Sequence, residues 1–211
     1  MNHSTLKDRA YEIVKEKLLS GEYPPGSRIR EDLIAEEISM SRTPVREAIN
    51  QLSAEGFLNN IPRKGIFFIE LTPKEIRELL DVREVLEALA VEKCIEHLND
   101  DNLNELKSIL KEFEDALNKE NYHECNELDS KFHQKIAEIS GNKKLILYIK
   151  DIEGFMMVGR NIEKKNNPKE KNMKTLEEHK RILMSIEQRD KKDAVNAVRE
   201  NINRMKKNMG I

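Results

Sequence analysis

The sequence has no tryptophan and lacks three glycine-based motifs that mark common enzyme classes. It contains neither GxGxxG nor GxxxxGK, on which nucleotide phosphates usually rest, and no GxSxG elbow for a nucleophilic serine. The sequence therefore lacks the motifs that usually indicate a nucleotide-binding fold or a serine hydrolase.

Long apolar stretches are also missing. No run of residues reaches the length that crosses a bilayer, and the N-terminus lacks the apolar centre of a signal peptide. We therefore expect a cytoplasmic protein with no membrane partner.

The two cysteines, Cys94 and Cys125, have no CxxC spacing, so we expect reduced thiols in the core. With 37 basic and 39 acidic side chains the net charge is -2, which argues against wholesale wrapping of nucleic acid but permits a local basic surface.

Proline is rare in the second part of the chain, because five of the six prolines lie before residue 74. The first part alternates short helical patterns with turns, whereas the rest consists of long periodic helical patterns. We predict a mostly α protein with two domains, residues 1–70 and 74–211, joined by a linker at 71–73. Thr72 and Glu75 have the spacing of a capping box, which predicts that a helix begins there.

The first domain is predicted to contain three helices and a hairpin. The helices are expected to end near Ser20, Ile38 and Gly56, the third with Thr43 as its N-cap. The hairpin is expected to have a turn at 59–60 and a polar tip at 62–65. Three helices, the last two joined by a tight turn, followed by a hairpin predict a winged helix-turn-helix.

The third helix has the two faces that a DNA recognition helix needs, an apolar back and a polar N-terminal front. The expected contacts are the front residues and the hairpin tip: Ser41, Arg42, Thr43, Arg46, Arg63, Lys64 and Gly65. Residues 1–70 hold ten Lys/Arg against eleven Asp/Glu, but the segment 39–66 holds four basic residues against two acidic ones, a small positive patch. The alternative is that these arginines are solvated charges on an ordinary helical domain.

The segment Ser41-Arg42-Thr43-Pro44-Val45-Arg46-Glu47-Ala48-Ile49, followed by Leu52 and Glu55-Gly56, closely resembles the GntR family of bacterial regulators. Pro25-Gly26 and Ile29 agree with this resemblance. It implies that the front and tip residues named above contact DNA. Asp32 departs from the pattern, since some relatives carry a DNA-contacting arginine there, and no contact is assigned to it.

The second domain is predicted to be an all-α six-helix bundle. The expected helices cover 73–98, 101–119, 121–140, 143–164, 169–188 and 190–209. The first has two apolar faces, which favours a core on one side and a homodimer partner on the other. The second face consists of Val82, Val85, Leu86 and Leu89.

Polar residues fall on the apolar faces of four of these helices, at Arg83 with Glu87, Asp129 with His133, His179, and Asn201. Buried polar groups are costly unless paired, so four such places in one bundle suggest a polar chamber. Asp129 and His133, four apart, have workable metal-ligand spacing, and His179 could bring a second imidazole. The alternatives are a surface Asp129–His133 pair, a satisfied core His179, and a structural Arg83–Glu87 salt bridge.

A second resemblance covers most of residues 74–205. The segments 80–87, 128–133 leading to Ser140-Gly141-Asn142, and 178–182 look like the FCD ligand domain of the FadR branch, and six helices resemble its VanR-like subgroup. Metal-binding members use one Asp and three His, which implies ligands at Asp129, His133 and His179 for a zinc- or nickel-like ion. The fourth position aligns with Asn201, whose amide oxygen is a weaker ligand.

Together these features predict a ligand-responsive regulator, expected to be a repressor, that binds a palindromic operator as a dimer. Arg83, with Glu87 beside it, is expected to hold a small carboxylate effector, because a planar guanidinium matches a carboxylate. One alternative is a regulator whose metal or polar core is purely structural, without an inducer. A more remote alternative is a metal-dependent hydrolase, which would leave the DNA-binding half unexplained.

Overall fold

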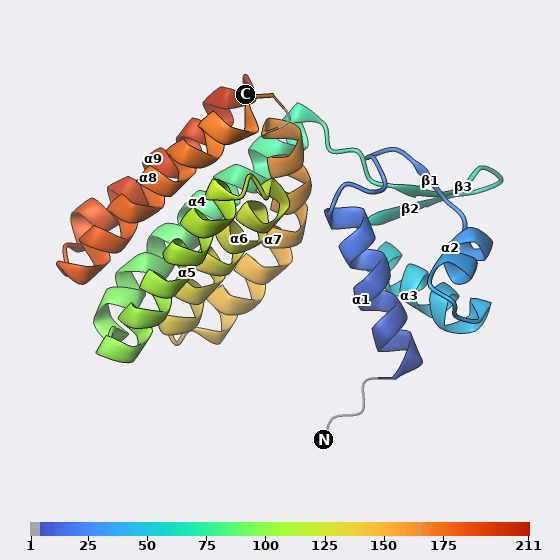
Figure 1. Ribbon diagram of the computed structural model, residues 1–211, viewed down its shortest axis with the longest axis horizontal. Helices are drawn as coiled ribbons and strands as arrows, with labels where there is room; N and C mark the ends of the chain where they lie inside the picture. Colours follow the sequence, from blue (N-terminus) through green and yellow to red (C-terminus); the bar gives the residue numbers. More distant parts are fainter. Residues whose placement is uncertain (1–4, 165) are drawn as a thin grey trace. The chain divides into compact units, whose positions relative to one another are not determined.

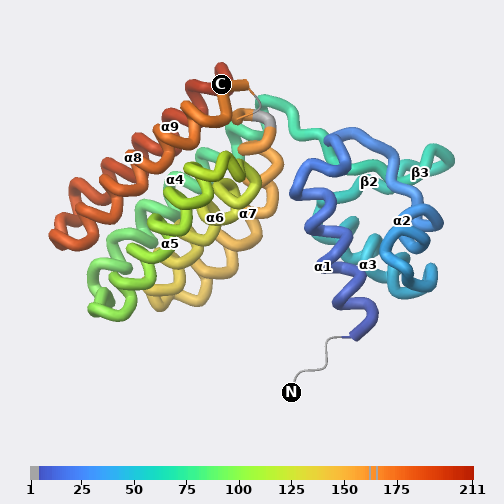
Figure 2. The backbone as a smooth tube through the Cα atoms, in the orientation of Figure 1, coloured from blue at the N-terminus to red at the C-terminus, as the bar shows by residue number. Residues whose placement is uncertain are grey.

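The computed structural model describes residues 5–164 and 166–211, with the side chain of residue 162 not described. The chain is mostly helical and divides after Leu71 into two compact units, here called the winged unit and the helical unit. Figures 1 and 2 show the course of the chain through each unit. Among the described residues, no helix is both long and apolar enough to cross a membrane.

The winged unit is a three-helix cluster with a small sheet. Its elements are α1 (Leu6–Leu19), β1 (Arg28–Ile29), α2 (Glu31–Glu37), α3 (Arg42–Ala54), β2 (Leu58–Ile61) and β3 (Gly65–Phe68). The strands are antiparallel in the order β1-β3-β2, with Ile29 opposite Ile66 and Leu58 opposite Phe68. α1 packs on α3, and α2 packs on α3 as in a helix-turn-helix (Figure 1). The predicted winged helix-turn-helix is therefore confirmed.

Two local expectations for this unit were wrong, and one short strand was not predicted. Asn59 and Asn60 lie within β2, and the turn that joins the strands covers residues 62–64. α3 begins at Arg42 with Ser41 as its N-cap, not at Thr43. Pro44 is tolerated in the first turn because the N–H groups there have no intrahelical acceptor. β1 was not predicted, since two residues are too short to show a period.

The helical unit consists of α4 (Pro73–His97), α5 (Asp100–Asn118), α6 (Tyr122–Ile139), α7 (Lys143–Glu163), α8 (Pro168–Glu187) and α9 (Lys191–Asn208). α4 contacts α6, α7, α8 and α9, and α8 and α9 run side by side (Figure 1). The predicted start of α4 is confirmed: the Thr72 hydroxyl accepts from the Glu75 N–H, and the Glu75 carboxylate accepts from the Thr72 N–H.

Helical periodicity explains which side of each helix is inside. In α5, for example, Leu106, Ile109, Leu110, Phe113 and Leu117 are buried, which is the spacing of a single apolar face. Both cysteines are free and buried, as predicted. What distinguishes this unit is a group of charged side chains inside the same core.

Candidate functional site

Three potential metal ligands meet inside the helical unit. Asp129 and His133 project from adjacent turns of α6, and His179 projects from α8. The Nε2 atoms of both histidines lie 3.3 Å from Oδ1 of Asp129, and all three side chains are buried. The sequence prediction that these residues come together is thus met by the geometry, and the surface-pair alternative for Asp129 and His133 is wrong.

The two distances from Asp129 Oδ1 to the imidazole nitrogens fit a small divalent cation, and all three donor atoms lie within 4.8 Å of one another. Ligand bonds of about 2.0–2.1 Å in a tetrahedron place neighbouring donor atoms about 3.3 Å apart. Among the described residues, neither the Nε2 of His133 nor either ring nitrogen of His179 makes a hydrogen bond of good geometry. Buried imidazole nitrogens without a hydrogen-bond partner are costly, so their lone pairs are suited to a metal. Phe132 stacks on the His179 ring, with centroids 4.7 Å apart, and fixes its plane.

The other oxygen of Asp129 faces two cations that the sequence analysis missed. Arg160 Nε lies 2.8 Å from Oδ2 of Asp129, and Lys164 Nζ lies 3.4 Å from the same atom. Arg160 belongs to α7, Lys164 directly follows that helix, and both are buried. Arg160 also donates to Glu153 Oε2 at 2.9 Å and to the Ser130 hydroxyl at 2.7 Å. Asp129 is therefore paired by the protein itself on one oxygen and faces two imidazoles on the other.

Arg83 and Glu87 join the same set of ion pairs from α4. Arg83 Nε donates to Glu87 Oε1 at 2.5 Å, so the structural salt bridge held open as an alternative is present. Arg83 Nη2 lies 3.3 Å from Glu153 Oε1, and Glu87 Oε2 lies 2.7 Å from Nδ1 of His133. We call Arg83, Arg160, Lys164, Glu87, Asp129 and Glu153 the buried charge cluster. In it three cations meet three carboxylates.

The pKa values of residues in this cluster, and of the neighbouring His179, show how burial and ion pairing compete. Burial alone would raise the pKa of Asp129, but Arg160 and Lys164 outweigh it and hold that pKa well below its usual value. Burial acts the same way on Glu87, and Arg83 overcomes it to give a pKa of about 2. For His179 burial dominates and lowers the pKa to about 4. Asp129 is thus an anion and His179 a neutral base at neutral pH, the forms that bind metal. His133 differs, because burial alone would lower the pKa of its imidazole but Glu87 outweighs burial and raises that pKa, so the ring must lose a proton before Nε2 can bind a metal.

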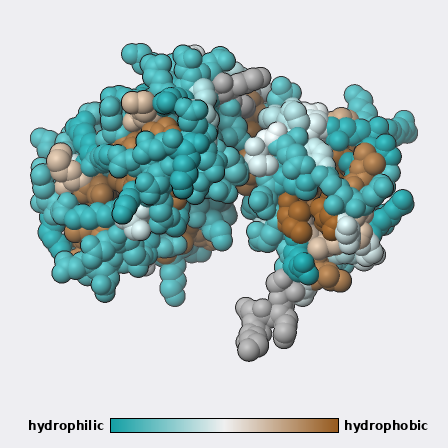
Figure 3. All heavy atoms as spheres, viewed as in Figure 1, coloured by the Kyte–Doolittle hydropathy of each residue, from teal (hydrophilic) through white to brown (hydrophobic). Residues whose placement is uncertain are grey.

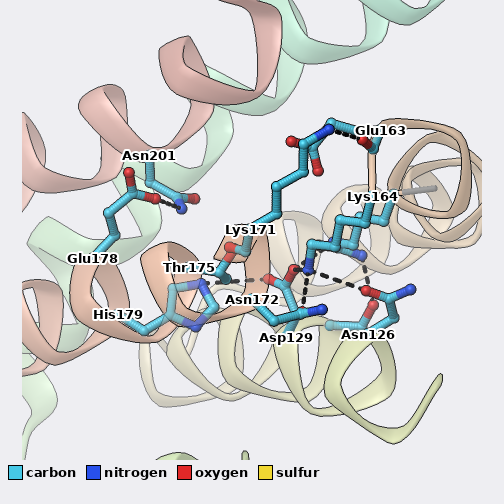
Figure 4. A network of polar contacts seen from close by, with 12 residues as sticks. Asn126, Asp129, Glu163, Lys164, Lys171, Asn172, Thr175, Glu178, His179 and Asn201 are labelled. Carbon is cyan, nitrogen blue, oxygen red and sulfur yellow. Dashed lines mark hydrogen bonds and ion pairs between the residues drawn. The ribbon is translucent and has the colours of Figure 1, made fainter. Parts of the chain in front are cut away.

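Asn201, the doubtful fourth ligand, is engaged elsewhere. Its Nδ2 donates to Glu178 Oε2 at 2.7 Å, and Figure 4 shows this pair apart from the Asp129 carboxylate. Glu178 is also held by Arg204, 2.6 Å away. Within the described part of the chain, the group of potential ligands that come together is Asp129, His133 and His179. Among the described residues, the candidate metal centre thus brings together one carboxylate and two imidazoles.

The residues expected to contact DNA lie on two surface features of the winged unit. Ser41, Arg42, Thr43 and Arg46 are exposed around the start of α3, and Arg63, Lys64 and the half-buried Gly65 form the wing tip. Arg46 Nε is 3.0 Å from Glu31 Oε2 on α2, whereas Arg42, Arg63 and Lys64 form no ion pair with the described residues. The exposed basic groups free to meet phosphate are therefore mainly at the first turn of α3 and at the wing.

Arg28, on β1, is a basic residue of the wing that the sequence analysis missed. A Cβ at Gly65 would stand 3.0 Å from the Arg28 Nε, and Gly65 has a φ of +113°, where side chains are rarely accommodated. Glycine thus lets the Arg28 side chain lie against the wing backbone. Arg28 and Arg30 are both exposed, but Arg30 is paired with Asp32 at 2.6 Å.

Both halves of the chain match known families. The model of the bacterial regulatory proteins of the gntR family matches residues 6–68, and the FCD domain matches residues 78–204. The HTH-type transcriptional regulator YdhC of Bacillus subtilis is 30% identical over 87% of this chain and 82% of its own length. The gluconate operon transcriptional repressor of the same species is 26% identical over 91% of this chain and 79% of its own length.

Solved structures share the whole fold. Escherichia coli McbR/YncC has a TM-score of 0.86 at 23% identity and covers 96% of this chain and 95% of its own. A GntR regulator from Rhodococcus has a TM-score of 0.84 at 17% identity, covering 96% of each chain. At these identities the likeness concerns the fold alone.

The winged fold, the helical fold and the matched families define a DNA-binding transcriptional regulator and not an enzyme. The chain belongs to the GntR family of bacterial regulators and carries an FCD domain.

Proposed function

We propose that this chain is a ligand-responsive repressor that binds a palindromic operator as a homodimer and senses a small organic acid through a metal-containing site in its helical unit. Within the GntR family we place it in the FadR branch and its VanR-like subgroup. The observation that carries the proposal is the Asp129–His133–His179 trio, inside a core that also holds the Arg83 guanidinium. As a regulator of bacterial genes it would act in the cytoplasm.

The DNA-contacting part of the proposal rests on the exposed polar groups of the winged unit. Ser41, Arg42, Thr43 and Arg46 would enter the major groove from α3, while Arg63, Lys64 and Gly65 would approach the adjacent backbone. We add Arg28 to this set because its guanidinium lies against Gly65. Glu31 would orient Arg46 or release it to a base.

Replacing Arg46 by alanine tests this assignment. A base contact by a guanidinium is worth about 1–3 kcal/mol of discrimination, so the operator affinity of Arg46→Ala should fall by about ten- to a hundredfold. Arg30→Ala is the matched control, since Arg30 is exposed but neutralised by Asp32. Fluorescence anisotropy with a labelled operator at fixed salt measures both. Unchanged binding by Arg46→Ala would remove Arg46 from the interface.

The sensing part of the proposal assigns roles to the buried groups. Asp129, His133 and His179 would hold a zinc- or nickel-like ion, which when bound supplies a Lewis-acidic position open to a ligand oxygen. Asn201, whose Nδ2 donates to Glu178, would have to bring its amide oxygen to the ion to become a fourth ligand. Arg83 would receive the effector carboxylate through Nη2, which would have to exchange its ion pair with Glu153 Oε1, 3.3 Å away, for that carboxylate. Glu87 holds Nε and fixes the guanidinium plane.

The dimer part of the proposal rests on α4. Val82, Val85 and Leu89 are exposed at spacings of three and four residues, and Leu86 between them is half-buried. These positions share one face of a helix. Figure 3 shows hydrophobic residues exposed among hydrophilic ones on the visible face of the helical unit. We assign this face to a second copy of the chain, since a two-fold operator needs two recognition helices one DNA turn apart.

The direction of control is proposed from a relative. The gluconate operon repressor of Bacillus subtilis is named for repression, and repression relieved by an effector is the behaviour we propose here. An effector changes operator affinity only through its different affinity for the two states of the regulator.

One alternative is favoured by a specific observation. The buried charge cluster is already paired within the protein, as the Arg83–Glu87 and Arg160–Asp129 contacts show. A regulator with a purely structural polar core, without inducer, would have this arrangement too.

Native mass spectrometry separates the two functions. The full chain, purified with and without chelator, should carry one metal ion per protomer before chelation. A thermal-shift screen of small carboxylic acids should then give a shift that depends on the metal. A chain without metal that responds to no acid would favour the structural alternative.

A further inference from the structure

Lys164 lies in a cage of oxygen atoms beside the candidate metal centre. Its Nζ is 2.9 Å from Asn172 Oδ1, 3.0 Å from Asn126 Oδ1 and 3.4 Å from Asp129 Oδ2. Three helices meet here, because Asn126 and Asp129 belong to α6, Lys164 follows α7, and Asn172 belongs to α8 (Figure 4). A fully buried ammonium is held by three acceptors, which is what burial of a lysine requires.

The two amides of this cage are fixed so that their oxygens face the cation. Asn126 Nδ2 donates to Asn161 Oδ1 at 2.9 Å, and Asn172 Nδ2 donates to the Pro168 carbonyl at 2.8 Å. Each amide therefore uses its N–H₂ group elsewhere and keeps its oxygen for Lys164. The cage is specific for a positive charge, and the chain fills it with its own side chain.

This cage and the metal centre share a single carboxylate. Oδ2 of Asp129 faces Lys164 and Arg160, and Oδ1 faces the two imidazoles. A divalent cation at Oδ1 would have the ammonium on the other side of the same carboxyl group. Like charges this close repel strongly in a buried site.

We propose that Lys164 is a tethered cation that sets the metal affinity of the Asp129–His133–His179 centre, weakening it by supplying Asp129 with positive charge from within the chain. The proposal rests on the metal centre of the proposed function. Of the two cations that face Asp129, Arg160 is tied to Glu153 and Ser130 as well, whereas Asp129 is the carboxylate that pairs with Lys164. Lys164 is thus the group whose charge is directed at the centre.

The proposal implies that the metal-free chain is more stable with Lys164 than without it. With Lys164 in place, Asp129 has a partner before any ion arrives, so the helical unit folds without metal. A metal must then compete with a charge already bound, and the centre responds to higher metal concentrations than the three ligands alone would require.

Substitution of Lys164 by glutamine tests this directly. The full-length chain, stripped by chelator and then dialysed, is titrated with Zn²⁺ and separately with Ni²⁺ in competition with a chromophoric chelator. We expect K164Q to bind the metal about tenfold more tightly or better than the unmodified chain, the size of effect that one nearby charge has on a buried ionisable group. Metal-free K164Q should melt at a lower temperature, because Asp129 loses a partner.

Lys174→Gln is the matched control. Lys174 lies on α8 with its side chain 57% exposed and is paired with Glu177, so the same substitution should leave metal affinity within about twofold, as expected for a screened surface charge. Asp129→Asn should abolish binding both in the unmodified chain and in combination with K164Q, which places the bound ion at this centre.

Asn172→Asp keeps the proposal testable if K164Q does not fold. It adds a negative charge to the cage with almost no change of shape, and it should tighten metal binding while Lys164 stays in place. A merely structural role for Lys164 does not predict tighter binding from K164Q. The new carboxylate of Asn172→Asp also attracts the metal directly, so the part of its effect that acts through Lys164 is the part that disappears when Asn172→Asp is combined with K164Q.

The outcomes separate this proposal from the metal centre itself. Metal binding by the unmodified chain with equal or weaker affinity in the folded variants overturns the role of Lys164 and leaves the centre standing. Absence of binding in the unmodified chain and in both variants overturns both. Binding seen only after the charge of Lys164 is removed or neutralised supports the role of Lys164 and contradicts a metal in the native regulator.

Discussion

The two units of this chain bury different kinds of side chain. Among the described residues of the winged unit, the buried side chains are apolar, and its charged groups lie at the surface. The helical unit buries Arg83, Glu87, Asp129, Arg160 and Lys164 in the middle of its core. An apolar core needs only good packing, whereas buried charges need matched partners, so the second core is sensitive to the charge of anything that enters it.

The sharpest way to test this contrast is to remove one buried cation. Arg160→Met keeps much of the side-chain volume but leaves Asp129 and Glu153 without a cation they now contact. Removing one partner of a buried ion pair costs about 3–5 kcal/mol. Hydrogen exchange measured on peptides from each unit should show weaker protection in the helical unit and no change in the winged unit.

Arg199→Met provides the control for that experiment. Arg199 is 53% exposed and lies 3.7 Å from Glu84. A surface pair of this kind is worth about 0–1 kcal/mol. A comparable loss of protection from both variants would mean that burial of the charge is not what matters.

The corresponding experiment in the winged unit removes apolar volume. Leu52 on α3 is completely buried. Leu52→Ala should destabilise this unit by about 2–5 kcal/mol, through lost transfer energy and the cavity left behind. Denaturant unfolding followed by exchange in α1 and α3 measures it, and the helical unit should keep its protection. If the helical unit lost protection to the same extent, the two units would unfold as one.

The smallest expected effect lies at the boundary between the units. Thr72 caps α4 through its hydroxyl and shares a capping box with Glu75. Thr72→Ala should cost about 1 kcal/mol, while Thr72→Ser should be nearly neutral because it retains the oxygen. The exchange rates of the first-turn amides of α4 report this directly, and equal rates in the two variants would assign the cap no role.

The sequence predicted the helices and the trio of Asp129, His133 and His179, because long helical periods and helix-face spacing are local properties. It did not predict the ion pairs made by Glu153, Arg160 and Lys164. These three are seven and four residues apart, so they lie on one face of a continuing helix, and this spacing was a usable signal. Whether such a face meets water or a neighbouring helix depends on tertiary packing, which the spacing alone does not contain.

The contacts of Asn201 and Arg83 also differ in part from those expected from the sequence. Their burial was predicted correctly from their positions on apolar faces. The partner of Asn201 lies on another helix, whereas Glu87 is four residues from Arg83 on α4, and their salt bridge was an open alternative. Glu178 holds Asn201, and Glu87 holds Arg83. The short strand β1 was missed because its pairing with β3 joins segments far apart in the sequence.

α4 begins directly after Thr72, the first residue of the helical unit, and also carries Arg83 and Glu87. A helix of 25 residues is about 37 Å long and resists stretching, because each turn is closed by its own hydrogen bonds. Arg83 lies about three turns from the first residue of this helix. A displacement of the Arg83 backbone along the axis therefore reaches Thr72 almost undiminished, so the point where the chain enters the helical unit moves in step with the charges at its centre.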